Sequence, residues 1–272
     1  MPVHVPVLAV IGHKHSGKTT VVEGLVSELV KKGFKVATAK HVLQKGFTMD
    51  TEGKDTWRHS VAGANPVTMV SDKETVIKIK DGVKTVSLVT LSKTAEENGA
   101  NVMVLEGFSS IVLKDKSVAK IICVRNQDEY GEYKKNAKGE VLAYCSIHSI
   151  DKKVLNTRKG LPVIVEKAAA FIEKNRKILE TLNQLAGLDC RKCGKTTCWE
   201  LAEAIYKGEA GLDECILLKA KPQLKTTLEV KETEVPIQPF VAEIIQKTVL
   251  GMVSTLKGVN IKGDEQIHID IT

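Results

Sequence analysis

The sequence has few aromatic residues: Phe, Trp and Tyr together make up 4% of its 272 residues. Proteins that hold single-stranded nucleic acid rely largely on stacking bases against such rings, so this chain offers little for that purpose. Its formal net charge of +7 comes from lysines that are spread along the chain and interspersed with acidic residues. We interpret these lysines as a solvated surface and expect no nucleic-acid partner.

Long apolar runs are also missing, and no stretch has the length that a transmembrane helix needs. The N-terminal "MPVHVPVLAVIGHK" has no basic segment before its apolar part, so we predict no signal peptide. Internal repeats and low-complexity segments are absent as well. The sequence therefore predicts a globular, cytoplasmic protein that does not associate with a membrane.

The first 33 residues contain a phosphate-binding pattern. The apolar run 5–12 is typical of a buried parallel strand, and G-x-x-x-x-G-K-T follows it at residues 12–19. Apolar residues then recur on one helical face up to Gly33, which predicts a helix. Backbone N–H groups in such a loop, beside a helix N-terminus, cradle phosphate oxygens. The residues expected to bind a nucleotide here are Gly12, His13, Lys14, His15, Ser16, Gly17, Lys18, Thr19 and Thr20.

A bound Mg²⁺ would need a carboxylate beside this loop as well as the Thr19 hydroxyl. The apolar strand 102–105 ends in Glu106, which we predict as that ligand, although Glu106 could also merely cap its strand. Lys18 and Glu106 are then the candidate catalytic residues, with Lys18 at the outer phosphates. A second predicted strand, 35–41, is followed by a polar loop that runs into a helix and contains Asp50 and Asp55. Charged residues past a strand end suit a substrate site.

Six cysteines are distributed unevenly. Cys123 and Cys145 lie in apolar, strand-like contexts and are predicted to be small buried residues. The other four form C-x2-C-x4-C-x16-C, and in a cytosolic protein such a group indicates a metal centre before disulfides. Four thiolates suit a [4Fe–4S] cluster or Zn²⁺, and the single C-x-x-C favours the cluster, with zinc or free thiols as alternatives. The predicted ligands are Cys190, Cys193, Cys198 and Cys215.

The cysteine segment repeats the letters GKTT at 194–197, which raises the question of a second phosphate site. Here, however, Asp189 stands where the first glycine of the pattern would be, and an amphipathic helix rather than a strand precedes it. We interpret this GKTT as a look-alike. Arg191, Lys192 and Lys195 would instead offset the negative charge of a cluster.

These patterns predict an α/β fold: a mostly parallel sheet of the P-loop NTPase type, with helices on both faces. The expected organisation is a nucleotide-binding domain at 1–165, a connecting helix at 166–186, an iron–sulfur domain at 187–220 and a small α+β unit at 221–272. In that last unit we predict a hairpin-like stretch at 227–240, a helix at 239–256 and a strand at 265–271.

Four motifs in the first domain, "GHKHSGKTT", "KVATAKH", "FTMDTEGKDTWRHSVAGA" and "NVMVLEGF", resemble the molybdopterin-guanine dinucleotide biosynthesis protein B family. The resemblance covers roughly residues 1–165. It implies a GTP-binding accessory protein, commonly a homodimer, that works beside a molybdopterin nucleotidyltransferase and is at most a weak GTPase. Carried over by position, Gly12, Gly17, Lys18 and Thr19 would hold GTP, and Asp50, Asp55 and Glu106 would lie near Mg²⁺ or the substrate.

The sequence departs from a typical guanine-binding pattern because it has no N-K-x-D. The strand-end "VRNQD", with Arg125, Asn126 and Asp128, has a different spacing. The preference for GTP over ATP is therefore implied by the resemblance alone.

The segment "CRKCGKTTCWELAEAIYKGEAGLDEC" is similar to the four-cysteine domain of corrinoid iron–sulfur proteins and of electron-transport complex subunits, which implies a [4Fe–4S] cluster. Two functions follow. One is an accessory GTPase for molybdenum or tungsten cofactor maturation, in which the cluster has a redox or docking role. The alternative is a nucleotide-gated electron carrier or metallochaperone that serves a redox partner enzyme.

Overall fold

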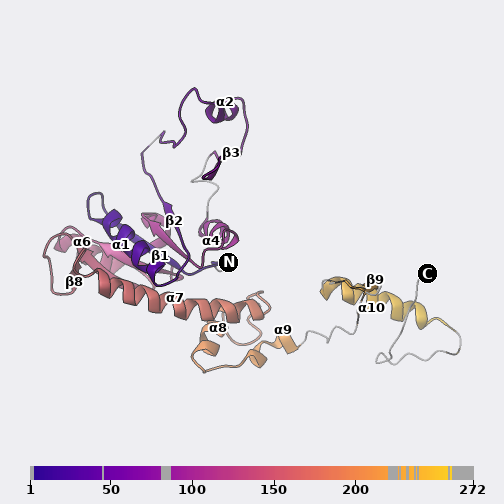
Figure 1. Ribbon diagram of the computed structural model, residues 1–272. Coiled ribbons are helices and arrows are strands. Elements are labelled where there is room, and N and C mark those ends of the chain that lie inside the picture. The colour runs from indigo at the N-terminus through magenta and orange to yellow at the C-terminus, as the bar shows by residue number, and fades with distance from the viewer. Residues whose placement is uncertain are drawn as a thin grey trace. The chain divides into compact units, whose positions relative to one another are not determined.

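The computed structural model describes residues 3–44, 46–80 and 87–219, and beyond these 226, 228–230, 233–235, 237, 239–256 and 258. The chain divides into two compact units, Met1–Leu182 and Asn183–Thr272 (Figure 1). In the part of the chain described, no helix combines the length and apolar character needed to cross a membrane.

The first unit is built on a six-stranded sheet in the order β2-β5-β1-β6-β7-β8. Every pair of neighbouring strands in it is parallel, as predicted for this fold class. Its central strand is the apolar run that precedes the phosphate loop, and residues 7–11 of that strand are buried. The strands are β1 (Val7–Gly12), β2 (Val36–Lys40), β5 (Val102–Glu106), β6 (Val118–Cys123), β7 (Val141–Ser146) and β8 (Val154–Asn156).

Helices cover both faces of this sheet, which confirms the predicted layering (Figure 1). Because side chains alternate along a strand, Leu8 and Val10 pack with α1 and α7 on one face. On the other face, Val7, Ala9 and Ile11 pack with α4, α5 and α6. The helices are α1 (Lys18–Lys31), α4 (Leu88–Glu97), α5 (Ser109–Val112), α6 (Gln127–Asn136) and α7 (Leu161–Gln184).

The helix α7 differs from the connecting helix predicted at 166–186. It begins at Leu161, before the predicted domain boundary at 165, and its residues Ile164, Val165 and Ile172 belong to the core beside the sheet. The sequence did indicate this earlier helix start. Pro162 lies in the first turn of the helix, where a backbone N–H has no partner within the helix, so proline is tolerated there. The first half of this helix is therefore part of the first unit rather than a linker.

Between β2 and α4 the chain forms a small substructure of its own. The helix α2 (Asp55–Val61) is followed by β3 (Val67–Val70) and β4 (Thr75–Lys78), which pair antiparallel in a separate two-stranded sheet. The expected helix after the polar segment is present, whereas the hairpin was not predicted from the sequence.

The second unit contains the cysteine segment and short elements beyond it. The predicted hairpin-like stretch contains the antiparallel pair β9 and β10, and the helix predicted at 239–256 ends at Val253. The strand predicted at 265–271 lies outside the described residues. The elements are α8 (Cys198–Tyr206), the 3-10 helix η1 (Leu212–Glu214), α9 (Ile216–Lys219), β9 (Glu229–Val230), β10 (Thr233–Glu234) and α10 (Pro239–Val253).

A fully buried lysine, Lys120, joins the segments at one end of the sheet. From β6 its Nζ donates to the backbone carbonyls of Asp115, Val118 (2.8 Å) and Lys138 (2.6 Å). The three donors of an ammonium group are thereby used within the protein. Burial lowers the pKa of Lys120. The loops before β6 and β7 therefore depend on one side chain that the sequence did not single out.

We expect Lys120→Ala to lower the free energy of unfolding by about 3 kcal/mol or more, because three carbonyls would lose their donor in a buried site. Urea denaturation followed by circular dichroism measures this change. Lys116→Ala, at an exposed position in the same loop, is the matched control and should change the stability by less than about 0.5 kcal/mol. Equal stability of the two variants would contradict this role for Lys120.

Candidate functional site

The backbone of the loop between β1 and α1 requires glycine at both glycine positions of the G-x-x-x-x-G-K-T pattern. Gly12 has φ +148°, and a Cβ there would lie 2.1 Å from the carbonyl oxygen of Cys123. Gly17, the N-cap of α1, has φ +87° in the left-handed region. The loop also holds His15 at φ 62°, a conformation that costs energy for a residue with a side chain. Strand, loop and helix thus have the geometry that the sequence pattern predicted.

Lys18 lies across this loop. Its Nζ donates to the carbonyl oxygen of His13 at 2.6 Å, and the N–H of Ser16 donates to the same oxygen at 3.3 Å. Burial lowers the pKa of Lys18, against the opposing influence of Cys123 and Glu106. The hydroxyl of Ser16 is buried, and among the described residues its oxygen has no hydrogen-bond partner. A positive charge and an unsatisfied hydroxyl therefore belong to a loop whose exposed members are His13, Lys14, His15, Thr19 and Thr20.

The predicted magnesium ligands are in contact with each other. Thr19 Oγ1 donates to Glu106 Oε1 at 2.8 Å, and Lys40 Nζ lies 3.0 Å from the same oxygen. These residues meet because β1, β5 and β2 are parallel neighbours, so that their carboxyl ends share one edge of the sheet. The side chain of Glu106 is only 11% exposed, and a cation already contacts it in the form of the Lys40 ammonium. This edge is suited to a positively charged ligand.

On the other side of β1, Arg125 follows β6 and is held by Glu129. The carboxylate of Glu129 accepts from the backbone N–H of Arg125 at 2.9 Å and from its Nε at 2.6 Å. The hydrogen bond from Arg125, together with the ion pair, lowers the pKa of the Glu129 carboxyl despite its burial. Asn126 caps α6 by accepting from the N–H of Glu129, so its side-chain oxygen is used within the protein. This pairing was not predicted, although the i, i+4 spacing of Arg125 and Glu129 was visible.

Asp50 and Asp55 are not brought into this cluster. Asp50 accepts from Lys78 Nζ at 2.6 Å and from Thr56 Oγ1 at 2.8 Å, and these two contacts lower its pKa. Its hydrogen-bond partners among the described residues belong to the segment 48–78 itself. Asp55 is exposed at the start of α2. In this structure Asp50 therefore ties α2 to the β3–β4 hairpin.

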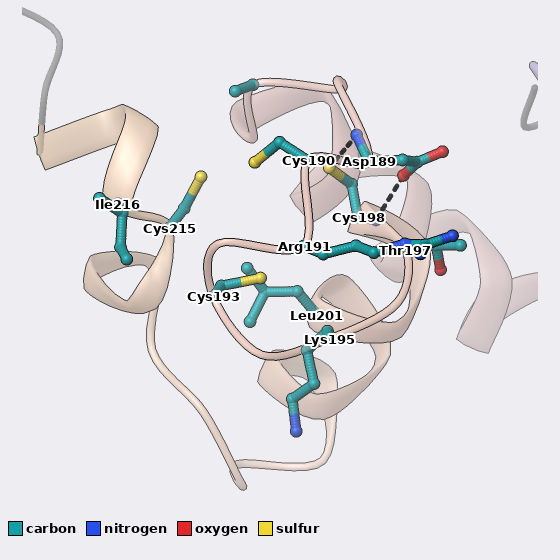
Figure 2. A pocket seen from close by; sticks show the side chains of 11 residues that line it. Asp189, Cys190, Arg191, Cys193, Lys195, Thr197, Cys198, Leu201, Cys215 and Ile216 are labelled. Atoms are coloured by element: carbon teal, nitrogen blue, oxygen red, sulfur yellow. Dashed lines mark hydrogen bonds between the residues drawn. The ribbon is translucent and has the colours of Figure 1, made fainter.

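The four cysteines of the second unit line one pocket, together with Asp189, Arg191 and Lys195 (Figure 2). All four are free thiols; Cys190 is exposed, Cys193 is half-buried, and Cys198 and Cys215 are buried. Within the described ranges, no group of three or more His, Cys, Asp or Glu side chains is arranged to hold a single metal ion.

Two carboxylates accept hydrogen bonds from backbone N–H groups at the start of α8, where the second GKTT ends. Asp189 accepts from the N–H of Cys198 at 2.6 Å, and Glu200 accepts from the N–H of Thr196 at 2.9 Å. The hydroxyl of Thr197 caps the helix by accepting from the N–H of Glu200. Negative side chains thus take the donors that a phosphate would need. The geometry agrees with the interpretation of this segment as a look-alike, and it reveals a role for Asp189 that sequence reasoning missed.

Two family models match the chain. The model described as "Molybdopterin guanine dinucleotide synthesis protein B" matches residues 7–146, which is just over half of the chain. The model described as "Putative Fe-S cluster" matches residues 185–217, a range that contains all four cysteines of the pocket.

Two curated relatives agree with the first match. A "Putative molybdopterin-guanine dinucleotide biosynthesis adapter protein" of Methanocaldococcus jannaschii is 29% identical over 266 residues, which cover 98% of each chain. A "Molybdopterin-guanine dinucleotide biosynthesis adapter protein" of Haemophilus influenzae is 32% identical and covers 62% of this chain and 88% of its own length. The crystal structure of Bacillus subtilis MobB aligns with a TM-score of 0.48 at 20% identity, covering 61% of this chain and 98% of the other. Because the first family model matches more than half of the chain, this chain belongs to the molybdopterin guanine dinucleotide synthesis protein B family.

Proposed function

We propose that this chain is a GTP-binding adapter that assists the attachment of a guanine nucleotide to molybdopterin. The observation that carries the proposal is the complete phosphate-binding loop, with glycine at both special backbone positions and Lys18 across the loop. The names of the two curated relatives indicate the pathway. A cytoplasmic homodimer that meets a molybdopterin nucleotidyltransferase is part of the same proposal.

The residues of the loop fit a magnesium nucleotide. The N–H groups of residues 14–20 would donate to phosphate oxygens, and Lys18 would exchange the carbonyl of His13 for the outer phosphates. Thr19 and Glu106 would hold Mg²⁺, which neutralises phosphate charge when bound. Lys40, now at 3.0 Å from Glu106, would turn away from the metal. Asp50 and Asp55 keep a proposed role in binding the substrate.

Slow hydrolysis of GTP fits these contacts better than rapid turnover. Oε1 of Glu106 is already contacted by the Thr19 hydroxyl and the Lys40 ammonium, so this oxygen is not free to orient an attacking water. The carboxylate is therefore suited to holding a metal and poorly suited to acting as a general base. An adapter with weak GTPase activity is the expected result.

The second unit is proposed to hold a [4Fe–4S] cluster through Cys190, Cys193, Cys198 and Cys215. Four thiols around one pocket are the donor set of such a cluster, and the match over residues 185–217 supports the same assignment. Arg191 and Lys195 line the pocket, where their charge would stabilise the anionic cluster. Because the first family match ends at residue 146, the cluster is an addition to that domain, with a docking role or a redox role toward a partner protein.

The nucleotide assignment is tested by titrating the purified protein with GTP and ATP in the presence of Mg²⁺. We expect GTP to displace ATP, and equal affinities would remove the guanine preference while leaving the phosphate site intact. The pathway is tested by analysing the same protein for bound molybdopterin or its guanine dinucleotide after incubation with each. Failure to bind either pterin, with nucleotide binding retained, would favour a nucleotide-gated electron carrier or metallochaperone.

A further inference from the structure

Two residues with a left-handed backbone flank the first cysteine of the pocket in the second unit. Asp189 has φ 46° and Arg191 has φ 61°, on either side of Cys190. This region of φ is unfavourable for residues with a side chain, although Asp adopts it more readily than most. Such a backbone persists only where other contacts hold it, and it is often found at functional sites. The contacts of these residues are therefore informative.

Asp189 and Cys198 are joined by two hydrogen bonds that run in opposite directions (Figure 2). The backbone N–H of Asp189 donates to Sγ of Cys198 at 3.4 Å. The carboxylate of Asp189 accepts from the backbone N–H of Cys198 at 2.6 Å. Because Asp189 directly precedes Cys190 in the chain, this reciprocal pair fixes the third cysteine of the pattern relative to the first.

The two groups of Asp189 act differently on a negatively charged sulfur. Cys198 is buried, so a thiolate there depends on donors within the protein, and the N–H of Asp189 is such a donor. Hydrogen bonds to the ligand sulfurs are among the factors that set the reduction potential of an iron–sulfur cluster. The carboxylate of Asp189 also lines the pocket, and a negative charge there opposes the addition of an electron.

We propose that Asp189 is a positioning residue for the iron–sulfur cluster: it holds Cys198 in place relative to Cys190 and, by its charge, keeps the reduction potential of the cluster low. Residues that orient metal ligands in this way commonly affect both the affinity and the redox properties of a site. The inference rests on the proposed cluster in the second unit, and it adds a residue that is not itself a ligand.

The test compares two substitutions of Asp189 in the full chain, purified anaerobically. Asp189→Ala removes the acceptor for the Cys198 N–H and disfavours the left-handed backbone, so a ferrous-iron chelator should remove iron roughly tenfold faster than from the wild type. Asp189→Asn keeps an acceptor oxygen and tolerates the same backbone, so iron should be lost at the wild-type rate. Because Asp189→Asn lacks the negative charge, a redox titration followed by visible absorbance should give a more positive midpoint potential.

The matched controls are Glu200→Ala and Glu200→Gln, which make corresponding changes at the same helix start. The exposed carboxylate of Glu200 accepts from the N–H of Thr196 at 2.9 Å instead of from a cysteine. Glu200→Ala should lose iron at the wild-type rate. Glu200→Gln should shift the midpoint potential less than Asp189→Asn does, because the charge it removes is screened by solvent.

Four outcomes would overturn the inference. Asp189→Ala could keep its iron as the wild type does, Asp189→Asn could lose iron as fast as Asp189→Ala, Asp189→Asn could have the wild-type potential, or Glu200→Ala could lose iron as fast as Asp189→Ala. In each of these cases the wild type still contains iron, so the proposed cluster stands and only the role of Asp189 fails. A wild-type protein without iron would overturn the proposed cluster itself. If Asp189→Ala takes up no iron at all, the iron content and potential of Asp189→Asn decide the outcome.

Discussion

Lys18→Ala is expected to lower the affinity for Mg²⁺·GTP by about a hundredfold while the fold and the iron content remain unchanged. Lys18 supplies a point charge to the outer phosphates, and a hydrogen bond between charged groups contributes about 1.5–3 kcal/mol. Its Nζ donates a hydrogen bond to the carbonyl of His13, in a loop that is otherwise held by backbone geometry. Isothermal titration calorimetry with GTP and ATP measures the loss.

The matched control is Lys31→Ala, at the other end of the same helix, where Lys31 pairs with Glu28 on the surface. This variant should bind GTP as the wild type does. Binding to Lys18→Ala at wild-type affinity would show that the nucleotide site lies elsewhere. Because burial lowers the pKa of Lys18, the wild-type affinity should also begin to fall, as the pH rises, at a lower pH than an ordinary lysine would dictate.

Cys193→Ala is expected to abolish the cluster in the second unit. Anaerobically purified wild-type protein should be brown and contain about four irons per chain. The variant should lose both properties, because three thiolates leave one iron without its ligand and metal binding is coupled to folding in so small a module. Iron analysis and visible absorbance measure the effect. A colourless wild-type protein with one zinc would overturn the iron–sulfur assignment.

Two variants separate this effect from general damage. Cys145→Ala removes a buried thiol from β7 in the first unit and should leave the iron content unchanged. Lys195→Ala should leave the affinity for GTP unchanged, because the N–H groups beside it already bind Glu200 and Asp189. Loss of nucleotide affinity in Lys195→Ala would mean that the second GKTT is a phosphate loop after all.

Local sequence was enough to distinguish the first GKTT from the second. The conformation of a phosphate loop is imposed by its own residues: glycine where φ is positive, an apolar strand before it and an amphipathic helix after it. The second GKTT has neither the first glycine nor the strand, and Asp189 takes a donor at its helix start. The contact between Thr19 and Glu106 could be anticipated too, since parallel strands bring their carboxyl ends to one edge.

Contacts between segments far apart in sequence were invisible at that level. Lys120 could have been one more surface lysine, and only the packed loops around it show three carbonyls at its Nζ. The contact of Asp50 with Lys78, at 2.6 Å, could not be foreseen either, because Lys78 belongs to a hairpin that the pattern did not reveal. The start of α7 was placed late although residues 161–165 are apolar, because the sheet that buries them is formed by distant strands.

The sequence by itself therefore determined the fold class, the phosphate loop and the four candidate ligands of a cluster, because each depends on residue types at short, fixed spacings. Tertiary structure alone decided what surrounds them: Lys40 at Glu106, and Ile147 with Thr157 beside Gly17. Those neighbours come from strands that are distant in sequence and adjacent in the sheet, and the strand order that brings them together is set by packing of the whole domain rather than by any local pattern.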